Sequence, residues 1–484
     1  IATGLAAGNA VLAKPADPTA IVAAIGVRLM REAGVPAESI QLLPGRGSVV
    51  GACLTSDPRV NGICFTGLTK TAQTINKSMT AEITPTAPLI AETGGLNVML
   101  VDSTALPEQA IKDIVASAFQ SAGQRCSALR LLYVQDDVAE TIKTMLYGAM
   151  DELVIGNPWE YNTDVGPVIN QGAYNEIVDY IEMARGEGRI LKQLEAPNEG
   201  TFVPPTVLCV NGVEDLTKEV FGPVMHIATY KASEIDRVID AINASGYGLT
   251  FGMHSRIDER VEQVTSKLNV GNIYINRNQI GAIVGSQPFG GEGLSGTGPK
   301  AGGPSYVKRF AQPQNRSIEM TQTAIADITM VQTALARAPR PSRKPLNRLV
   351  LPGPTGESNV LSTYGRGVFL CLGPTLEAAL SQAKIARENG CSTVIVAAGA
   401  TGEGDVDGSL DPAQLGQLLG IDAVVSWAPE TELRAMRQVL ATRTGALVPL
   451  INDADFADRC HLERHVCVDT TAAGGNASLL AQAS

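Results

Sequence analysis

Cys126 and Glu92 are the two residues whose surroundings best suit covalent chemistry. Glu92 precedes Thr93-Gly94-Gly95, and Cys126 lies in the run Gly123-Gln124-Arg125-Cys126-Ser127-Ala128. A thiolate adds readily to an aldehyde carbonyl, and a carboxylate beside it can deprotonate the water that hydrolyses a thioester. The polar run around Cys126 predicts a partly open loop; the alternative is a buried core cysteine. For Glu92 the alternative is an ion-paired carboxylate at a strand end.

Two turns upstream of Glu92 each precede a predicted helix. Phe65-Thr66-Gly67 stands at the mouth of a helix predicted to begin at Thr69, and the amides of a helix N-terminus favour anionic oxygens. Pro44-Gly45-Arg46-Gly47 predicts a glycine-rich turn between a strand and a helix. It lacks the G-x-G-x-x-G spacing, and most turns of this kind have only a structural role.

The elements that must position these residues follow an α/β pattern. Short apolar runs alternate with helical periods across 10–101 and again, with longer helices, across 98–275, which predicts parallel sheets with crossover helices in two domains. Strand signals vanish between 311 and 348 while Pro and Arg accumulate, which predicts a linker. A third, smaller α/β pattern follows, and we expect no catalysis there because neither chemical motif is repeated.

Composition and charge narrow the class of protein. The chain has 484 residues, too many for one ordinary core, and a formal net charge of −11. Its basic residues form no long run, so nucleic acid is not an expected partner. No apolar run reaches the roughly 20 residues that span a bilayer, and no signal-peptide layout opens the chain. The eight scattered cysteines predict reduced thiols. We therefore expect a cytoplasmic protein.

The Glu92 and Cys126 motifs, separated by one strand and one helix, resemble the active-site signatures of the aldehyde dehydrogenase superfamily. The resemblance implies Cys126 as nucleophile and Glu92 as general base. It also implies an α/β aldehyde dehydrogenase fold, with a truncated Rossmann-type NAD-binding domain, an α/β catalytic domain and a smaller aldehyde-dehydrogenase-like C-terminal domain. The expected boundaries are 1–93 with a return segment at 276–310 for NAD binding, 94–275 for catalysis, 311–348 for the linker and 349–484 for the last domain.

Further motifs resemble the family's cofactor site and imply NAD. Lys14-Pro15-Ala16-Asp17 resembles the turn that binds the adenosine ribose, although Asp17 is one methylene shorter than the usual acid. Leu68 stands where the pyrophosphate-binding turn usually has Ser, so a hydroxyl contact is lost. Glu219-Val220-Phe221-Gly222-Pro223 resembles the segment whose acid binds the nicotinamide ribose and whose Phe packs near the ring. The implied cofactor-binding residues are Lys14, Ala16, Asp17, Gly47, Thr66, Gly67, Leu68, Gly94, Glu219 and Phe221.

The run 278–291 resembles the aldehyde-anchor loop of the L-glutamate γ-semialdehyde (pyrroline-5-carboxylate) dehydrogenase branch. This implies a small amino-acid aldehyde whose carboxylate is bound by the Gly281 and Ala282 amides and the Ser127 hydroxyl, while Phe289 packs on the aliphatic part; a plain glycine-rich turn is the alternative. The runs 293–304 and 471–478 resemble the bifunctional proline utilization A family. That resemblance implies proline catabolism, a flavin (FAD) only in an upstream proline dehydrogenase domain, and a homo-oligomer.

Three alternatives remain open. The chain could be a coenzyme A-acylating aldehyde dehydrogenase, although a hydrolytic base such as Glu92 is then unneeded. It could be a non-catalytic scaffold, because it opens on Ile1 and we expect the natural chain to continue upstream with the rest of the nucleotide-binding domain. Cys460, His461, His465 and Cys467 could hold zinc, but adjacent side chains diverge and 466–470 predicts a strand, so no metal is expected.

Overall fold

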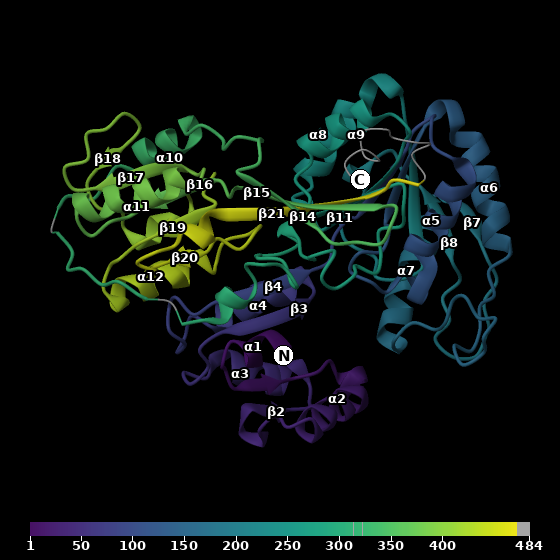
Figure 1. Cartoon of the computed structure of the whole chain (residues 1–484), viewed down its shortest axis with the longest axis horizontal. Helices are drawn as coiled ribbons and strands as arrows, with labels where there is room; N and C mark the ends of the chain where they lie inside the picture. The colour runs from purple at the N-terminus through teal and green to yellow at the C-terminus, as the bar shows by residue number, and fades with distance from the viewer. Residues whose placement is uncertain (313, 322, 472–484) are drawn as a thin grey trace. The chain divides into compact units, whose positions relative to one another are not determined.

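The computed structural model describes residues 1–471 except 313 and 322, and the chain forms two compact units that are treated separately below (Figure 1). Unit 1 comprises Ile1–Ala91, Thr297–Arg348 and Ser362–Glu463. Unit 2 comprises Glu92–Gly296, Leu349–Leu361 and, within the described residues, 464–471. Glu92 and Cys126 therefore both belong to unit 2, and their geometry can be examined within one unit.

A largely parallel sheet forms the centre of unit 2. Its strands follow the order β12-β11-β5-β6-β9-β8-β7, in which only the β7–β8 pair is antiparallel. The strands are β5 (Val98–Val101), β6 (Leu131–Gln135), β7 (Ile190–Gln193), β8 (Thr206–Cys209), β9 (Val224–Tyr230), β11 (Thr250–His254) and β12 (Asn272–Ile275). β5, β6, β11 and β12 are buried along their whole length, as expected for parallel strands covered on both faces.

Helices cover both faces of this sheet (Figure 1). α5 (Pro107–Phe119), α6 (Ala139–Asp151) and α7 (Gln171–Gly186) pack on one face, and α8 (Ile235–Ala244) and α9 (Asp258–Lys267) pack on the other. The sequence of α8 explains its packing, because the buried residues Ile235, Val238, Ile239 and Ile242 form one stripe at helical spacing. Proline at the first position of α5 starts that helix without losing a hydrogen bond.

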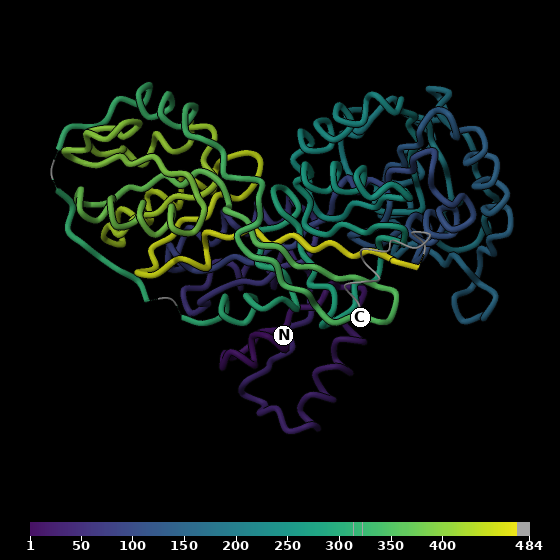
Figure 2. Tube along the Cα trace, turned by 45° about the horizontal axis from the view of Figure 1, so that its top comes forward, coloured from purple at the N-terminus to yellow at the C-terminus, as the bar shows by residue number. Residues whose placement is uncertain are grey.

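The edge of the sheet at β12 is extended by a strand from the far end of the chain. Residues 465–468 of β21 (His461–Asp469) pair in parallel with 272–275 of β12, and the long strand can be followed in Figure 2. β15 (Glu357–Gly365) and β14 (Asn347–Leu351) continue the strand order beyond β21. The Arg464 side chain forms an ion pair with Glu292, with an N–O distance of 2.8 Å, which anchors this strand within unit 2.

The first part of unit 1 contains short α/β elements. β1 and β2 pair in parallel, and β3 pairs with β4. The elements are α1 (Ala2–Ala6), β1 (Val11–Ala13), α2 (Ala20–Glu32), β2 (Ile40–Leu42), α3 (Ala52–Ser56), β3 (Ile63–Gly67), α4 (Thr69–Ser78) and the first three residues of β4 (Leu89–Thr93), whose last two belong to unit 2. α2 buries only Val27, whereas Ile21 and Val22 are 80% and 72% exposed. Its apolar face is thus largely uncovered.

The second part of unit 1 contains a five-stranded parallel sheet in the order β18-β17-β16-β19-β20. Its strands are β16 (Val368–Cys371), β17 (Ser392–Ala397), β18 (Val406–Asp407), β19 (Ala423–Val425) and β20 (Leu450–Ile451). Helices α11 (Leu376–Glu388) and α12 (Glu430–Leu440) lie on different faces of it, in two separate apolar cores. The α/β pattern predicted for this part of the chain is present.

The structure differs from the expected linker over part of 311–348. Residues Ile328–Arg337 form helix α10, and Asp327 caps it by accepting a hydrogen bond from the Thr329 amide at 2.7 Å. Val331 and Leu335 of this helix are buried in the core of the five-stranded sheet. The helical spacing of these two residues was a signal for a helix. The proline-rich run 338–345 suggested a linker for the whole segment, but it begins only after the helix ends.

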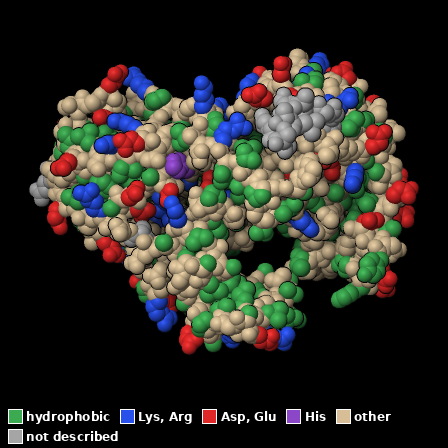
Figure 3. Space-filling model, viewed as in Figure 1, with side chains coloured by type: hydrophobic (Ala, Val, Ile, Leu, Met, Phe, Trp, Pro, Cys, Tyr) green, Lys and Arg blue, Asp and Glu red, His purple; other side chains and the backbone are tan. Residues whose placement is uncertain are grey.

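The surface of the protein shows no large region of a single charge in the view of Figure 3. Acidic and basic side chains are interspersed over the face shown in Figure 3. No helix in the described part of the chain is long and apolar enough to cross a membrane. No group of three or more His, Cys, Asp or Glu among the described residues is placed to hold a metal ion. Most of the run 471–478 lies outside the described residues.

Candidate active site

The loop that ends in Cys126 has an unusual backbone. It follows α5 as the turn η4 (Gln120–Gly123), in which Ser121, Ala122 and Gly123 have φ values of 56°, 54° and 65°. Left-handed conformations cost a non-glycine residue roughly 1–2 kcal/mol each, so the surrounding structure must hold this loop. At the third position glycine is required, because a Cβ would lie 2.1 Å from the carbonyl oxygen of Gly222.

Asn97 fixes the backbone at the nucleophile and directly after it. Its buried side-chain amide donates hydrogen bonds to the carbonyl oxygens of Cys126 at 2.7 Å and Ala128 at 3.0 Å. The Asn97 Oδ1 atom accepts a hydrogen bond from the backbone amide of Thr250 at 3.2 Å. The backbone at Cys126 is therefore tied to the start of the central strands β5 and β11 and has a defined position.

Arg130 anchors the same loop from inside the unit. This side chain is 1% exposed, and its guanidinium donates to the carbonyl oxygens of Gly123 at 2.8 Å and Arg125 at 3.1 Å. It also forms a buried ion pair with Glu219, whose Oε1 atom lies 3.0 Å from Nη2. One buried cation thus connects the nucleophile loop to the segment that carries Glu219, and both depend on its charge.

The thiol of Cys126 is half-buried, and its ionisation is controlled by that burial and by two carboxylates. Burial raises the pKa of the thiol above its ordinary value, and the negative charges of Glu219 and Glu92 raise it further. The backbone amides of Ser127 and Cys126 lower the pKa by hydrogen bonding to the sulfur. Because the thiolate is the nucleophilic form, its reactivity should increase with pH.

Glycines surround the carboxylate of Glu92, which belongs to β4. The Gly291 amide donates a hydrogen bond to Glu92 Oε2 at 3.0 Å, and Glu92 forms an antiparallel bridge with Gly296. A Cβ at Gly290 would lie 3.1 Å from Glu92 Oε1, and a Cβ at Gly296 would lie 2.9 Å from Oε2. Side chains at these positions would crowd the carboxylate, so the glycines leave it room to move and to contact a water or ligand.

Glu219, Gly94 and Phe221 lie close together in unit 2. A Cβ at Gly94 would lie 1.8 Å from Glu219 Oε2, so only glycine permits this approach. Burial raises the pKa of the Glu219 carboxyl, whereas the charge of Arg130 and the Gly95 amide lower it. The Phe221 ring is 39% exposed, and the Arg130 guanidinium lies 5.3 Å from its centroid. These residues offer an acid and an aromatic face near the Cys126 loop.

The expected anchor loop begins at Gln279, which is hydrogen-bonded to the residue after Cys126. Gln279 is fully buried, and its side-chain amide donates to the carbonyl oxygen of Ser127 at 3.2 Å. Gly281 has a φ of 72° and is exposed, and a Cβ there would lie 3.7 Å from Arg125 Nη1. The loop therefore starts beside the Cys126 backbone and presents Gly281 near an arginine. Ala282 and Phe289 are partly buried, and Ser127 is buried.

The remaining expected cofactor residues lie in unit 1 at strand ends. Lys14 and Asp17 follow β1 and form an ion pair with an N–O distance of 3.3 Å, and the adjacent Ala16 is exposed. Gly47 begins the short π-helical segment η3 (Gly47–Gly51) after β2, which pairs in parallel with β1. Parallel strands end at one edge of a sheet, so these residues share an edge. Thr66 and Gly67 end β3, and Leu68, which is 62% exposed, lies between β3 and α4.

The sequence patterns missed Asn97, Arg130 and Gln279. All three are polar residues that the fold buries, and their local sequence does not distinguish them from other polar residues. Arg130 in particular stands directly before the buried strand β6 and is among the largest fully buried side chains. A buried arginine demands a counter-charge, but the partner, Glu219, could not be identified from spacing alone because the two are brought together by tertiary structure.

Comparison with known proteins assigns the class. The model of the aldehyde dehydrogenase family matches residues 1–315. The match covers well over half of the chain and includes the Glu92, Cys126, Glu219 and anchor-loop motifs. The chain therefore belongs to the aldehyde dehydrogenase family, and its fold is the α/β fold of that family.

Two kinds of relative refine the comparison. The chain is 42% identical over 523 residues to the bifunctional protein PutA of Klebsiella aerogenes, covering 98% of this chain and 40% of that protein. It is 40% identical over 310 residues to the 1-pyrroline-5-carboxylate dehydrogenase of Geobacillus thermodenitrificans, covering 63% of this chain and 60% of the relative. The chain thus spans less than half the length of the PutA proteins it matches, although nearly all of it is aligned.

Solved structures give the same picture. A crystal structure of a mutant of Bradyrhizobium japonicum proline utilization A is 51% identical, with a TM-score of 0.63, over 64% of this chain and 32% of that one. A 1-pyrroline-5-carboxylate dehydrogenase from Thermus, with bound NAD, is 34% identical with a TM-score of 0.59, over 63% of this chain and 59% of that one. The similarity therefore extends to three-dimensional structure.

Proposed function

We propose that this chain oxidises L-glutamate γ-semialdehyde to L-glutamate with NAD, using Cys126 as nucleophile and Glu92 as general base. The observation that carries the proposal is the arrangement within unit 2: Asn97 and Arg130 hold the loop that ends in Cys126, and glycines leave room around the Glu92 carboxylate. The Glu92 charge is also among the causes that raise the pKa of the Cys126 thiol. A sulfur nucleophile and a carboxylate are what formation and hydrolysis of an acyl-enzyme require. The names of the PutA and pyrroline-5-carboxylate dehydrogenase relatives support the substrate.

The proposed chemistry uses the two residues in succession. The Cys126 thiolate attacks the aldehyde carbon and forms a thiohemiacetal, whose collapse with loss of hydride leaves a thioester on the sulfur. Glu92 then takes a proton from water, and the resulting hydroxide attacks the thioester carbon. The carbon–sulfur bond breaks, glutamate leaves and the thiolate of Cys126 is restored. The glycines around Glu92 give the carboxylate the freedom to reach that water.

NAD, when bound, would accept the hydride, and the residues present fit such a cofactor. In unit 2, Gly94 leaves space for the Glu219 carboxylate, which suits a ribose hydroxyl, and Phe221 presents a partly exposed ring. In unit 1, the amides at the start of the ten-residue helix α4 follow Thr66 and Gly67 and suit a pyrophosphate. Lys14 and Asp17 offer polar groups for the second ribose. Leu68 supplies no hydroxyl, so weak cofactor binding is expected.

The substrate's carboxylate is proposed to bind at the anchor loop. Ser127 supplies a hydroxyl, and the loop containing Gly281 and Ala282 supplies backbone amides, which are good anion receptors. Gln279 supports this assignment because it ties the beginning of the loop to the Ser127 carbonyl, so both groups are positioned together. Phe289 would pack against the aliphatic carbons.

The assignment predicts hydrolytic oxidation selective for an aldehyde with a terminal carboxylate. NADH formation should be measured with L-glutamate γ-semialdehyde and with propionaldehyde, which lacks the carboxylate. We expect kcat/KM to be higher for the semialdehyde by roughly 10- to 1,000-fold, since charge-assisted hydrogen bonds are lost with the smaller aldehyde. Formation of glutamyl-coenzyme A in the presence of coenzyme A would show a coenzyme A-acylating enzyme instead. If neither aldehyde gives NADH, the chain is a non-catalytic scaffold.

Glu92→Gln should stall the reaction after hydride transfer. The amide has nearly the same size but cannot accept the proton of water, so steady-state turnover should fall by about 10²- to 10⁴-fold. A burst of NADH equal to one turnover, and a covalent adduct on Cys126 detected by intact-protein mass spectrometry, should remain. Glu195→Gln, on an exposed residue of the same unit, serves as the control. Multiple turnovers by Glu92→Gln at the wild-type rate would remove Glu92 from the mechanism.

Cytoplasmic location and self-association are part of the proposal. The free cysteines suit a reducing compartment. β14 is an edge strand of its sheet, and its Val350 is 77% exposed, which leaves an apolar strand edge available to a second copy. Sedimentation at several protein concentrations tests the association.

A further inference from the structure

We propose that unit 1 contains a binding site for a small oxyanion of the phosphate class, separate from the residues assigned to the aldehyde reaction. The site is a cavity of about 210 Å³. Four arginines from different elements line it, and Arg437 belongs to helix α12. The others are Arg309 in the turn η8 (Val307–Phe310), Arg366 between β15 and β16, and Arg459 in the turn η10 (Ala457–Cys460).

Two of the four guanidinium groups have partners. Arg366 donates hydrogen bonds to the carbonyl oxygens of Arg459 at 2.9 Å and His461 at 3.2 Å, and it also contacts that of Thr297. Arg459 forms an ion pair with Asp453, with an N–O distance of 3.2 Å. The backbone carbonyls satisfy the donors of Arg366 but do not neutralise its charge.

The other two guanidinium groups have no hydrogen bond or ion pair within the described part of the chain. Arg437 is 8% exposed, and its Nη2 atom is buried without a hydrogen-bond partner in the described part of the chain. The Arg309 guanidinium has neither a hydrogen bond nor an ion pair with any residue that the structure describes. Arg309 is partly exposed and feels the charge of Asp453, whereas Arg437 is buried. A buried cation such as Arg437 is costly without a counter-charge, and a buried polar atom without a partner points to a bound water or ion.

The remaining ionisable groups at the cavity leave a positive excess. Lys308 pairs with Asp458, with an N–O distance of 3.4 Å, and Asp455 accepts a hydrogen bond from a backbone amide. Burial lowers the pKa of His461, which keeps the imidazole neutral near pH 7. Five cationic side chains therefore face three acidic ones. A phosphate carries a charge of about −1.5 to −2 near pH 7 and would balance the excess better than a carboxylate would.

Electrostatics and size agree with this ligand. Burial first, and then the neighbouring Arg459, lower the pKa of Arg437 to about 10. The pKa of Arg309 is also lowered, by burial first and then by Arg459. Guanidinium groups remain protonated in proteins, so these directions report a missing counter-charge. Drug-sized ligands occupy roughly 300 to 1,000 Å³, so the smaller cavity suits a single phosphate group and excludes a dinucleotide.

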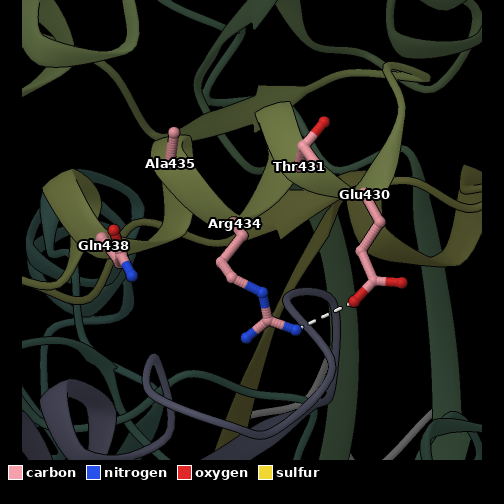
Figure 4. A pocket seen from close by; sticks show the side chains of 5 residues that line it. All are labelled: Glu430, Thr431, Arg434, Ala435 and Gln438. Atoms are coloured by element: carbon pink, nitrogen blue, oxygen red, sulfur yellow. Dashed lines mark hydrogen bonds and ion pairs between the residues drawn. The ribbon is translucent and has the colours of Figure 1, made fainter.

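The same helix supplies a matched control. Arg434 lies three residues before Arg437 and borders a separate shallow hollow on α12, where it points toward Glu430 (Figure 4). Its guanidinium donates to Glu430 at 2.8 Å and to the carbonyl oxygens of Ala81 and Ile83 at 3.2 Å each. Both terminal nitrogens of Arg434 thus have protein partners, whereas Nη2 of Arg437 has none in the described part of the chain. Only Arg437 should therefore affect anion binding.

The test is thermal unfolding of the 484-residue chain in increasing inorganic phosphate, with chloride adjusted to constant ionic strength. The melting temperature should rise with phosphate and saturate, because a ligand that binds only the folded state stabilises it. Arg437→Met should weaken phosphate binding at least 10-fold, and Arg434→Met should leave it unchanged. Without phosphate, Arg437→Met should melt no lower than the wild type, because an unpaired buried charge has been removed. A parallel titration with glycerol phosphate distinguishes a free ion from a phosphate ester.

Two results would overturn the proposal. One is a melting temperature that responds to phosphate no more than to chloride. The other is an equal phosphate response in Arg437→Met and Arg434→Met, which would place the ion elsewhere. Should Arg437→Met fail to fold, Arg309→Gln replaces it, because Arg309 lines the same cavity from a short turn in which no residue is fully buried. The assay does not use aldehyde turnover, so its outcome is independent of the proposed dehydrogenase function.

Discussion

Replacement of Cys126 by alanine should abolish NADH formation from L-glutamate γ-semialdehyde. Without the sulfur there is no thiohemiacetal, and the enzyme has no other nucleophile beside Glu92 among the residues assigned to the site. The loss should be roughly 10⁴-fold or more, the range found when a covalent nucleophile is removed. The folded state should be unaffected, because Cys126 contributes its backbone carbonyl, not its side chain, to the hydrogen bond from Asn97.

Cys209→Ala is the matched control for this variant. Cys209 is an exposed free cysteine on β8 of the same unit, so its removal tests the loss of a thiol without touching the site. Both variants should retain the melting temperature of the wild type within a few degrees. If turnover persists in Cys126→Ala, or disappears in Cys209→Ala, then Cys126 is not the nucleophile.

The ionisation of Cys126 should also appear in the pH dependence of the wild type. Burial and the charges of Glu219 and Glu92 raise the pKa of the thiol, so the thiolate is the minor form near pH 7 and becomes more abundant as pH rises. The rate of the NADH burst should therefore increase with pH on the alkaline side. The same shift means that folding disfavours the thiolate, so any contribution of this group to stability decreases as pH rises.

Local sequence patterns were sufficient for most of the fold. The predicted helix at 107–119 and the predicted strand at 131–134 are present as α5 and β6, because each has a strong apolar period of its own. The pairing of β21 with β12 could not be predicted from the sequence, because the apolar run 466–470 predicts a strand but not its partner. Helix α10 was missed because a proline-rich segment directly follows its short apolar stripe.

The sequence predicted the reactive residues of the site but not the residues that hold them in place. Cys126 and Glu92 stand in glycine-containing motifs whose composition is itself informative. Their support comes from Asn97, Arg130 and Gln279, which act through contacts distant in sequence. Nothing in spacing or composition distinguishes these from ordinary polar residues. The left-handed backbone at Ser121 and Ala122 was equally hidden, because neither residue type signals it.

Arg130→Met should destabilise the protein strongly and disrupt the nucleophile loop. The variant leaves the Glu219 carboxylate buried without its cation, which typically costs about 3–5 kcal/mol, and the carbonyls of Gly123 and Arg125 lose their donors. Urea unfolding should show a lower midpoint with an unchanged slope, and NADH formation should fall because the left-handed loop is no longer held.

The double variant Arg130→Met/Glu219→Gln separates charge from packing in this network. Removing both charges should restore much of the free energy of unfolding, since replacement of a whole buried ion pair is far less costly than breaking it. Activity should stay low in the double variant, because the donors to the Gly123 and Arg125 carbonyls are still missing. If Arg130→Met were as stable as the wild type, the ion pair would have no structural role; if the double variant were no more stable than Arg130→Met, the cost would come from lost loop hydrogen bonds rather than from the uncompensated Glu219 charge.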